Sequence, residues 1–291
     1  MSTAASSHVF VLCLCSFRLG VTQRLEWLSF RMNLDDIHRF VCPIWGRLHD
    51  SSRPELLGSG VLIYDGYEHL LLTAGHVMAK FDQGYRMGIW GPEILFSPRG
   101  LSFKFVATAE TRGGTEDIFD FGGLFLDAES AALAKDHKDF LPLDQLSGEQ
   151  PIEGSLALLF GYPVTRSKSS DSAATNEGLM VRSSVVSSER FPKTCYSERD
   201  HIFLDFNRKK GWLDDSGAPV SAPEPHGMSG GGIFVHQDPK DPSSPLKLVG
   251  IITEWHRDRK QCILGGTGLA FIVRRLQQQY AGRWGSLGKI V

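Results

Sequence analysis

The sequence predicts an all-β fold in a single domain. The chain of 291 residues contains 31 glycines, and its apolar residues fall in many short runs, which suit strands joined by tight turns. Residues 61–72 contain an Asp-Gly pair between two apolar runs, the strongest short signal for a β-hairpin. We find no internal repeat of useful period, and β proteins of this length commonly form one domain.

The first elements follow from these runs. Residues 1–36 form an extension before a domain over residues 37–291, and Leu34–Phe40 is expected to be an opening helix. Residues 61–64 and 67–72 are the two strands of the hairpin. The apolar run 121–126 predicts a further strand later in the chain.

Connections and a closing helix are predicted from polarity and spacing. The polar residues 135–154 form a connection, and residues 164–178, rich in Ser, Asp, Ala and Thr, form an exposed loop. Leu276, Tyr280 and Trp284 recur at helical spacing. This pattern predicts a short packing helix over residues 274–284.

Three polar residues occupy positions where chemistry is expected. Ser229 lies in the glycine-rich sequence of residues 227–231, and a tight turn of this kind holds a hydroxyl exposed beside backbone N–H groups. His76 follows the second strand of the hairpin among small residues, which suits an imidazole that faces a cleft. Asp120 directly precedes the strand 121–126, so its carboxylate is placed at a strand start.

Asp117 is an alternative to Asp120. The two aspartates are three positions apart, and strand alternation puts them on opposite faces, so that only one can face His76. We favour Asp120 because the uninterrupted apolar run follows it directly.

Together these motifs resemble the trypsin-like serine proteases. The sequences TAGHV around His76, DFGGLFL from Asp120 and GMSGG around Ser229 stand in the histidine, aspartate, serine order of that family. GSGVLI, LLFGYP, LVGIITEW and GGTGLAFIV are weaker matches. The likeness covers about residues 40–275 and is closer to bacterial trypsin-like and heat-shock proteases than to digestive ones.

The resemblance implies a fold of two six-stranded antiparallel β-barrels. The first barrel would span about residues 40–130 and the second about residues 152–273, with the polar stretch between them as the connection. His76 and Asp120 would then come from the first barrel and Ser229 from the second.

The resemblance also implies a mechanism. A serine hydroxyl needs an adjacent base at neutral pH, and histidine titrates in the useful range. His76 would accept the proton of Ser229, Asp120 would orient the imidazole, and the N–H groups of Gly227 and Ser229 would form the oxyanion hole. Met228 stands where zymogen-type relatives carry an aspartate, so activation by cleavage is not expected.

Residues around the turn are candidates for substrate binding. By the resemblance, the base of the specificity pocket lies at Pro223, which carries no charge. Glu224 could attract a basic residue or remain a surface carboxylate, and Thr253 stands where the family has a serine hydroxyl near the triad aspartate. The remaining candidates line the rim and walls of the pocket: His226, Glu254, Trp255 and Gly268.

Composition limits the partners. The net charge of −2 gives no global field for nucleic acid, and no run approaches the roughly 18 apolar residues of a membrane span. The five cysteines are odd in number and lack zinc-type spacing, so neither a disulfide framework nor a metal site is indicated. We expect a protein or peptide substrate and no cofactor.

Localisation depends on the N-terminal residues. The apolar run 9–17 is preceded by no Lys or Arg and followed by no A-x-A sequence, which argues against a signal peptide. We therefore expect a cytoplasmic protein. If residues 1–20 do act as a signal peptide, the protein is secreted or periplasmic.

The sequence thus predicts a serine endopeptidase that works through an acyl-enzyme. Two alternatives stay open: an esterase that uses the same triad, and a catalytically silent binding module that keeps the fold. Intact His76, Asp120 and Ser229 argue against the silent module.

Overall fold

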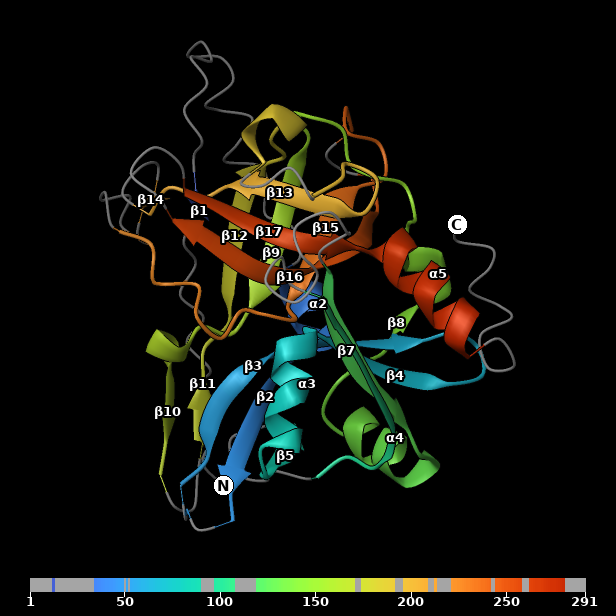
Figure 1. Cartoon of the computed structure of the whole chain (residues 1–291). Coiled ribbons are helices and arrows are strands. Elements are labelled where there is room, and N and C mark those ends of the chain that lie inside the picture. The colour runs from blue at the N-terminus through green and yellow to red at the C-terminus, as the bar shows by residue number, and fades with distance from the viewer. Residues whose placement is uncertain are drawn as a thin grey trace.

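Two curled antiparallel sheets make up most of the described chain (Figure 1). The computed structural model of the protein describes residues 12–13, 34–49, 51, 53–89, 97–107, 119–170, 174–191, 196–208, 212–213, 221–241, 244–257 and 262–280. Both sheets follow a path of six strands. The predicted all-β, double-barrel architecture is confirmed.

The first sheet holds the strands between residues 41 and 142, in the order β5-β2-β3-β4-β7-β6, with β8 parallel to β3. Its strands are β2 (Val41–Leu48), β3 (Glu55–Tyr64), β4 (His69–Thr73), β5 (Tyr85–Ile89), β6 (Gly100–Ala107), β7 (Phe119–Leu126) and β8 (Leu141–Pro142).

The second sheet has the order β12-β9-β15-β16-β17-β13. Its strands are β9 (Leu156–Gly161), β12 (Leu179–Ser184), β13 (His201–Asp205), β15 (Gly232–His236), β16 (Leu246–Arg257) and β17 (Cys262–Gly268). Two short pairs lie outside both sheets: β1 (Leu12–Cys13) with β14 (Trp212–Leu213), and β10 (Ser167–Ser169) with β11 (Ala174–Asn176).

Short helices connect and cover the sheets. The α-helices are α2 (Leu34–Phe40), α3 (Gly75–Asp82), α4 (Ala128–Lys135) and α5 (Leu269–Gln279), and the 3-10 turns are η2 (Leu143–Gln145), η3 (Val164–Arg166) and η4 (Ser188–Arg190). The opening helix at Leu34–Phe40 is confirmed. The predicted loop 164–178 instead contains η3 and the small β10-β11 hairpin.

The predicted hairpin is β3-β4, with a longer turn than expected. Tyr64 pairs with His69, so four residues form the turn. The Asp65 carboxylate accepts hydrogen bonds from the N–H groups of Tyr67 (2.8 Å) and Glu68 (2.6 Å), while Gly66 has a positive φ of 95°. The second strand therefore begins at residue 69 and not at residue 67.

Helix α5 begins earlier than predicted, because residues 269–273 are helical and not part of a strand. Phe271 in this first turn is 5 % exposed and packs against Phe119 and Phe121 of β7. At the other end, Tyr280 contacts Phe125. The helix thus leaves the second sheet and packs on the first, while Trp284 lies outside the described residues.

A buried lysine lies between the sheets. The Lys138 ammonium donates to the His38 carbonyl (2.6 Å) and to the Tyr162 hydroxyl (3.3 Å), which itself donates to the Val41 carbonyl (3.2 Å). Burial lowers the pKa of Lys138 from 10.5 to about 8. Burial likewise raises the pKa of neighbouring Cys42 from 9.0 to about 12.

These pKa shifts predict a pH dependence of stability. Between pH 8 and 9 folded Lys138 loses its proton while the unfolded chain keeps it, so the free energy of unfolding rises by up to about 1.4 kcal/mol per pH unit. Above pH 9 the Cys42 shift acts in the opposite direction, because unfolded Cys42 then loses its proton first. We expect the stability difference between wild type and Lys138→Met to grow in favour of wild type from pH 7.5 to 9.

Urea denaturation at several pH values measures this difference. Loss of the Lys138 hydrogen bonds in Lys138→Met changes the free energy of unfolding at every pH. Only a change of the stability difference with pH therefore tests the titration of Lys138. A difference that stays constant over this range would contradict the prediction.

Candidate active site

His76 is held at the beginning of α3. The helix starts at Gly75, directly after β4 ends at Thr73, so the His76 N–H belongs to the first turn and has no partner within the helix. The Asp120 carboxylate accepts from this N–H through Oδ1 at 2.8 Å. A carboxylate at this end of a helix is also favoured by the helix dipole.

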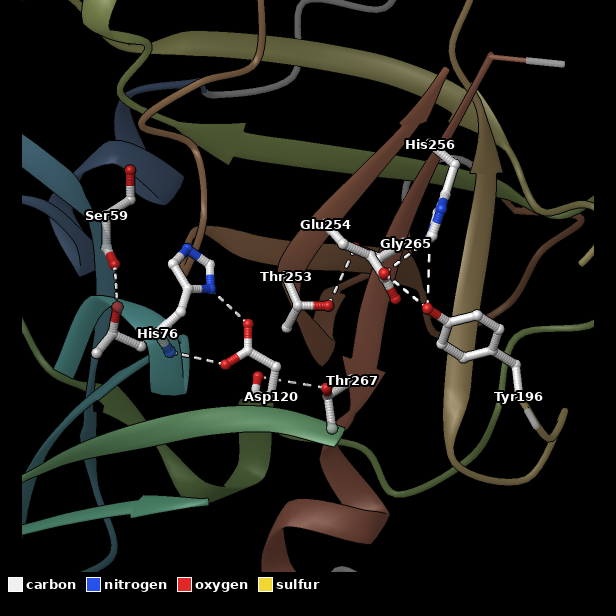
Figure 2. A network of polar contacts seen from close by, with 10 residues as sticks. Ser59, His76, Asp120, Tyr196, Thr253, Glu254, His256, Gly265 and Thr267 are labelled. Carbon is white, nitrogen blue, oxygen red and sulfur yellow. Dashed lines mark hydrogen bonds and ion pairs between the residues drawn. The ribbon is translucent and has the colours of Figure 1, made fainter. Parts of the chain in front are cut away.

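The second oxygen of Asp120 contacts the imidazole. Asp120 Oδ2 lies 2.5 Å from His76 Nδ1 (Figure 2), so one carboxylate orients both the backbone and the ring of the histidine. Asp120 is the second residue of β7, and its side chain points away from the buried Phe119 and Phe121 on either side. The predicted pairing of His76 with Asp120 therefore exists, while Asp117 lies outside the described residues.

Close packing requires a small residue beside this pair. A Cβ added at Gly75 would lie 2.9 Å from Asp120 Oδ1 and 2.7 Å from the Phe105 carbonyl. The second sheet also reaches the pair, because the Thr267 hydroxyl donates to the Asp120 carbonyl at 3.5 Å (Figure 2).

The glycine-rich turn brings Ser229 to the same place. Gly230, with φ of 86°, packs so tightly that an added Cβ would lie 2.1 Å from Thr73 Oγ1 and 3.0 Å from the N atom of Ala74. The backbone carbonyl of Ser229 accepts a hydrogen bond of 2.7 Å from the Ser59 N–H of β3. Ser229 thus joins the first sheet immediately beside the start of α3.

The Ser229 hydroxyl makes no hydrogen bond with the described part of the chain. Its side chain is partly exposed, and the His76 side chain is 46 % exposed. Both groups are therefore accessible from solvent.

The N–H groups of Gly227 and Ser229 each point opposite to a hydrogen-bonded carbonyl. The carbonyl that precedes Gly227 accepts from the Val164 N–H (2.7 Å), and the carbonyl that precedes Ser229 accepts from the Gly231 N–H (2.8 Å). All described peptides are trans, so each N–H points opposite to its bonded carbonyl. Neither N–H donates to any described group, which leaves both available for an anionic oxygen.

Met228, between these two donors, is fully buried. It packs in an apolar cluster of the second sheet with Ile233, Ile252 and Leu264. Buried Met228 therefore offers no charge to a partner in this place.

Glu224 is paired within the protein. Its carboxylate lies 2.7 Å from Arg208 Nη1, and Arg208 Nε donates to the Ala222 carbonyl at 2.9 Å. Pro223, between Ala222 and Glu224, is partly exposed. The charge of Glu224 is therefore compensated by Arg208, which no local sequence pattern marks as its partner.

The structure brings His226 and Trp255 together. Their rings meet edge to face with centroids 5.8 Å apart. Gly268 instead meets Gln150 and Asp200: an added Cβ would lie 2.2 Å from Gln150 Nε2, and the Gly268 N–H donates to the Asp200 carbonyl.

Thr253 and Glu254 make internal contacts (Figure 2). The Thr253 hydroxyl donates to the Gly265 carbonyl at 3.4 Å. Glu254 Oε2 accepts from the Tyr196 hydroxyl (2.7 Å) and lies 2.7 Å from His256 Nε2. Burial alone would raise the pKa of Glu254, but the contacts with His256 and Tyr196 outweigh it and the pKa is lowered.

A recess that the sequence does not indicate adjoins the turn. Val164 and Leu56 both contact the turn at residues 226 and 227, and both line a hollow of about 380 Å³. Its other lining residues are Trp45, Leu48, Ser51, Arg53, Pro54, Glu55, Ser167 and Ser169.

Two further kinds of feature are absent from the described residues. They contain no group of three or more His, Cys, Asp or Glu side chains that could hold a metal ion. No helix among them is long and apolar enough to span a membrane.

A solved structure has a similar fold. Neuropsin, a serine protease expressed in the limbic system of mouse brain, is similar to this chain with a TM-score of 0.51 and 15 % identity, over 83 % of this chain and 94 % of the neuropsin chain. No family model and no curated protein sequence match the chain. At this identity the likeness shows the fold alone, and the chain has the chymotrypsin-like double-barrel fold.

Proposed function

We propose that this protein is a serine endopeptidase with His76, Asp120 and Ser229 as its catalytic residues. The observation that carries the proposal is the double contact of Asp120 with the ring and the backbone N–H of His76, beside a turn that presents Ser229. The two unused N–H groups of that turn add support. The fold shared with a serine protease agrees with it.

The chemistry follows from this arrangement. Ser229 Oγ attacks the carbonyl carbon of the substrate while its proton passes to His76 Nε2, and the carbonyl oxygen becomes an anion stabilised by the N–H groups of Gly227 and Ser229. The C–N bond then breaks, the imidazolium returns the proton to the leaving amine, and an acyl-enzyme remains. Water attacks this ester with the same proton transfers and releases the acid. A serine-to-imidazole hydrogen bond is often long in a substrate-free enzyme and tightens with substrate.

An endopeptidase needs room on both sides of the bond that it cuts. His226 of the turn contacts Trp255 of β16. The 380 Å³ recess adjoins the turn through Leu56 and Val164. Both regions adjoin the turn at residues 226 and 227 and are candidates for contact with a substrate chain.

Labelling with a fluorophosphonate probe, followed by digestion of denatured protein, tests the proposal. An endopeptidase is labelled at one serine and cuts denatured protein at internal bonds. Labelling with hydrolysis of small esters alone would favour the esterase. A folded protein that is neither labelled nor active would be the silent binding module.

We expect cleavage after uncharged residues. Pro223 supplies no charge, and Glu224 is paired with Arg208, so neither of these two residues offers a free carboxylate to a Lys or Arg side chain in a desolvated pocket. Peptides with Val, Leu, Ala or Phe before the cut should therefore exceed Lys or Arg peptides. Differences among the apolar residues should stay within about 1–3 kcal/mol.

A peptide-library digest read by mass spectrometry measures this preference. Glu224→Gln should leave it unchanged, since its charge already has a partner. Dominant cleavage after Lys or Arg that disappears in Glu224→Gln would reverse the assignment.

A further inference from the structure

Ser59 connects the first sheet to the Ser229 turn at two points. This fully buried residue of β3 donates through its hydroxyl to the Gly227 carbonyl (2.8 Å) and through its N–H to the Ser229 carbonyl (2.7 Å). The hydroxyl also accepts from the Tyr162 N–H at 2.8 Å, and the Ser59 carbonyl accepts from the Thr73 hydroxyl at 2.6 Å.

The direction of the Ser59 hydroxyl proton is fixed by this arrangement. A backbone N–H can only donate, so the Ser59 oxygen must accept from Tyr162. Its single proton then points at the Gly227 carbonyl, which can only accept. Both partners belong to the second half of the chain, 103 and 168 positions away.

Gly227 needs such a restraint. Its φ of 91° lies in the region that glycine enters freely, and glycine has no side chain to limit rotation of the peptides around it. The peptide held by Ser59 lies between the two peptides that carry the N–H groups of Gly227 and Ser229. Its hydrogen bond limits the dihedral angles at Gly227 and Met228, which set the angle between these two N–H groups.

We propose that the Ser59 hydroxyl is a positioning residue for the oxyanion hole, an inference that rests on the proposed function. It acts through Gly227 and touches no reacting atom. Its loss should weaken stabilisation of the transition state more than binding of the substrate.

Ser59→Ala tests this inference, with Ser183→Ala as the matched control. Ser183 is also fully buried and donates its hydroxyl to a backbone carbonyl, that of Asp205 in β13, without contact to the turn. We expect Ser59→Ala to lower kcat and the rate of fluorophosphonate labelling about 10- to 100-fold, as a small misplacement of catalytic groups does. KM should stay within about twofold, since ground-state contacts remain. Ser183→Ala should change neither rate.

Thermal unfolding of both variants separates positioning from stability. If Ser59→Ala does not fold, Ser59→Cys, compared with Ser183→Cys, replaces it; the thiol fills the same position but is a much weaker donor, so the labelling rate should still fall, by less than in Ser59→Ala. Equal labelling rates of the wild type and a folded Ser59 variant would overturn the inference and leave the proposed function standing.

The labelling rate also separates the two proposals. If the wild type is labelled but cuts no peptide, the endopeptidase assignment fails, while the labelling rate of the Ser59 variant still decides the inference. A wild type that is not labelled overturns both.

Discussion

Ser229→Ala should abolish fluorophosphonate labelling and reduce kcat for peptides by about 10⁴- to 10⁶-fold, because the attacking oxygen is removed. The fold should be retained, since the turn is held through backbone atoms: the Ser229 carbonyl accepts from Ser59, and the Gly230 N–H donates to the Ile252 carbonyl. Mass spectrometry of the labelled protein and initial rates with one peptide measure the effect.

Ser221→Ala is the control for this variant. Ser221 is an exposed serine eight positions earlier in the same segment, and its loss should change neither labelling nor turnover. Labelling that persists in Ser229→Ala would exclude Ser229 as the nucleophile.

Asp120→Asn should reduce kcat by about 10³- to 10⁴-fold with a small change in KM. The amide oxygen of asparagine can still accept from the His76 N–H, so the start of α3 stays capped. The amide NH₂, however, would donate to His76 Nδ1 and fix the tautomer that cannot accept the serine proton. The helix should therefore survive while catalysis is lost.

Two further aspartate variants complete this experiment. Asp120→Ala removes the cap as well, so it should lower the melting temperature more than Asp120→Asn does. Asp117→Asn should change kcat little. A larger loss of kcat in Asp117→Asn than in Asp120→Asn would assign the role to Asp117.

The sequence predicted those features that depend on neighbouring residues. The β3-β4 hairpin follows from an Asp-Gly pair between apolar runs. His76 follows the end of β4 and Asp120 lies near the start of β7, as the local patterns indicate, and the two meet because these strands pair. The predicted start of α5 at residue 274 is too late, because the apolar run before it is as typical of a buried strand as of a helix.

Contacts between distant segments could not be predicted. Arg208 compensates Glu224 from 16 positions away, and Ser59 reaches Gly227 across 168 positions. A serine in a strand and an arginine in a polar loop are ordinary residues by composition and by local pattern. Ser59 finds its partner only when the two sheets dock, and Arg208 only when the segment before β15 lies beside the end of β13.

The turn that carries Ser229 is held by hydrogen bonds from both sheets, so a newly made chain cannot form it until both halves are present. Residues 227–231 belong to the second sheet, but both donors that Ser59 provides come from β3 of the first. During synthesis the strands of the first sheet are added before Ser229, and the turn acquires its final geometry only after the second half has folded against them. An unfinished chain on the ribosome therefore lacks the assembled turn, and the geometry around Ser229 is a property of the completed chain.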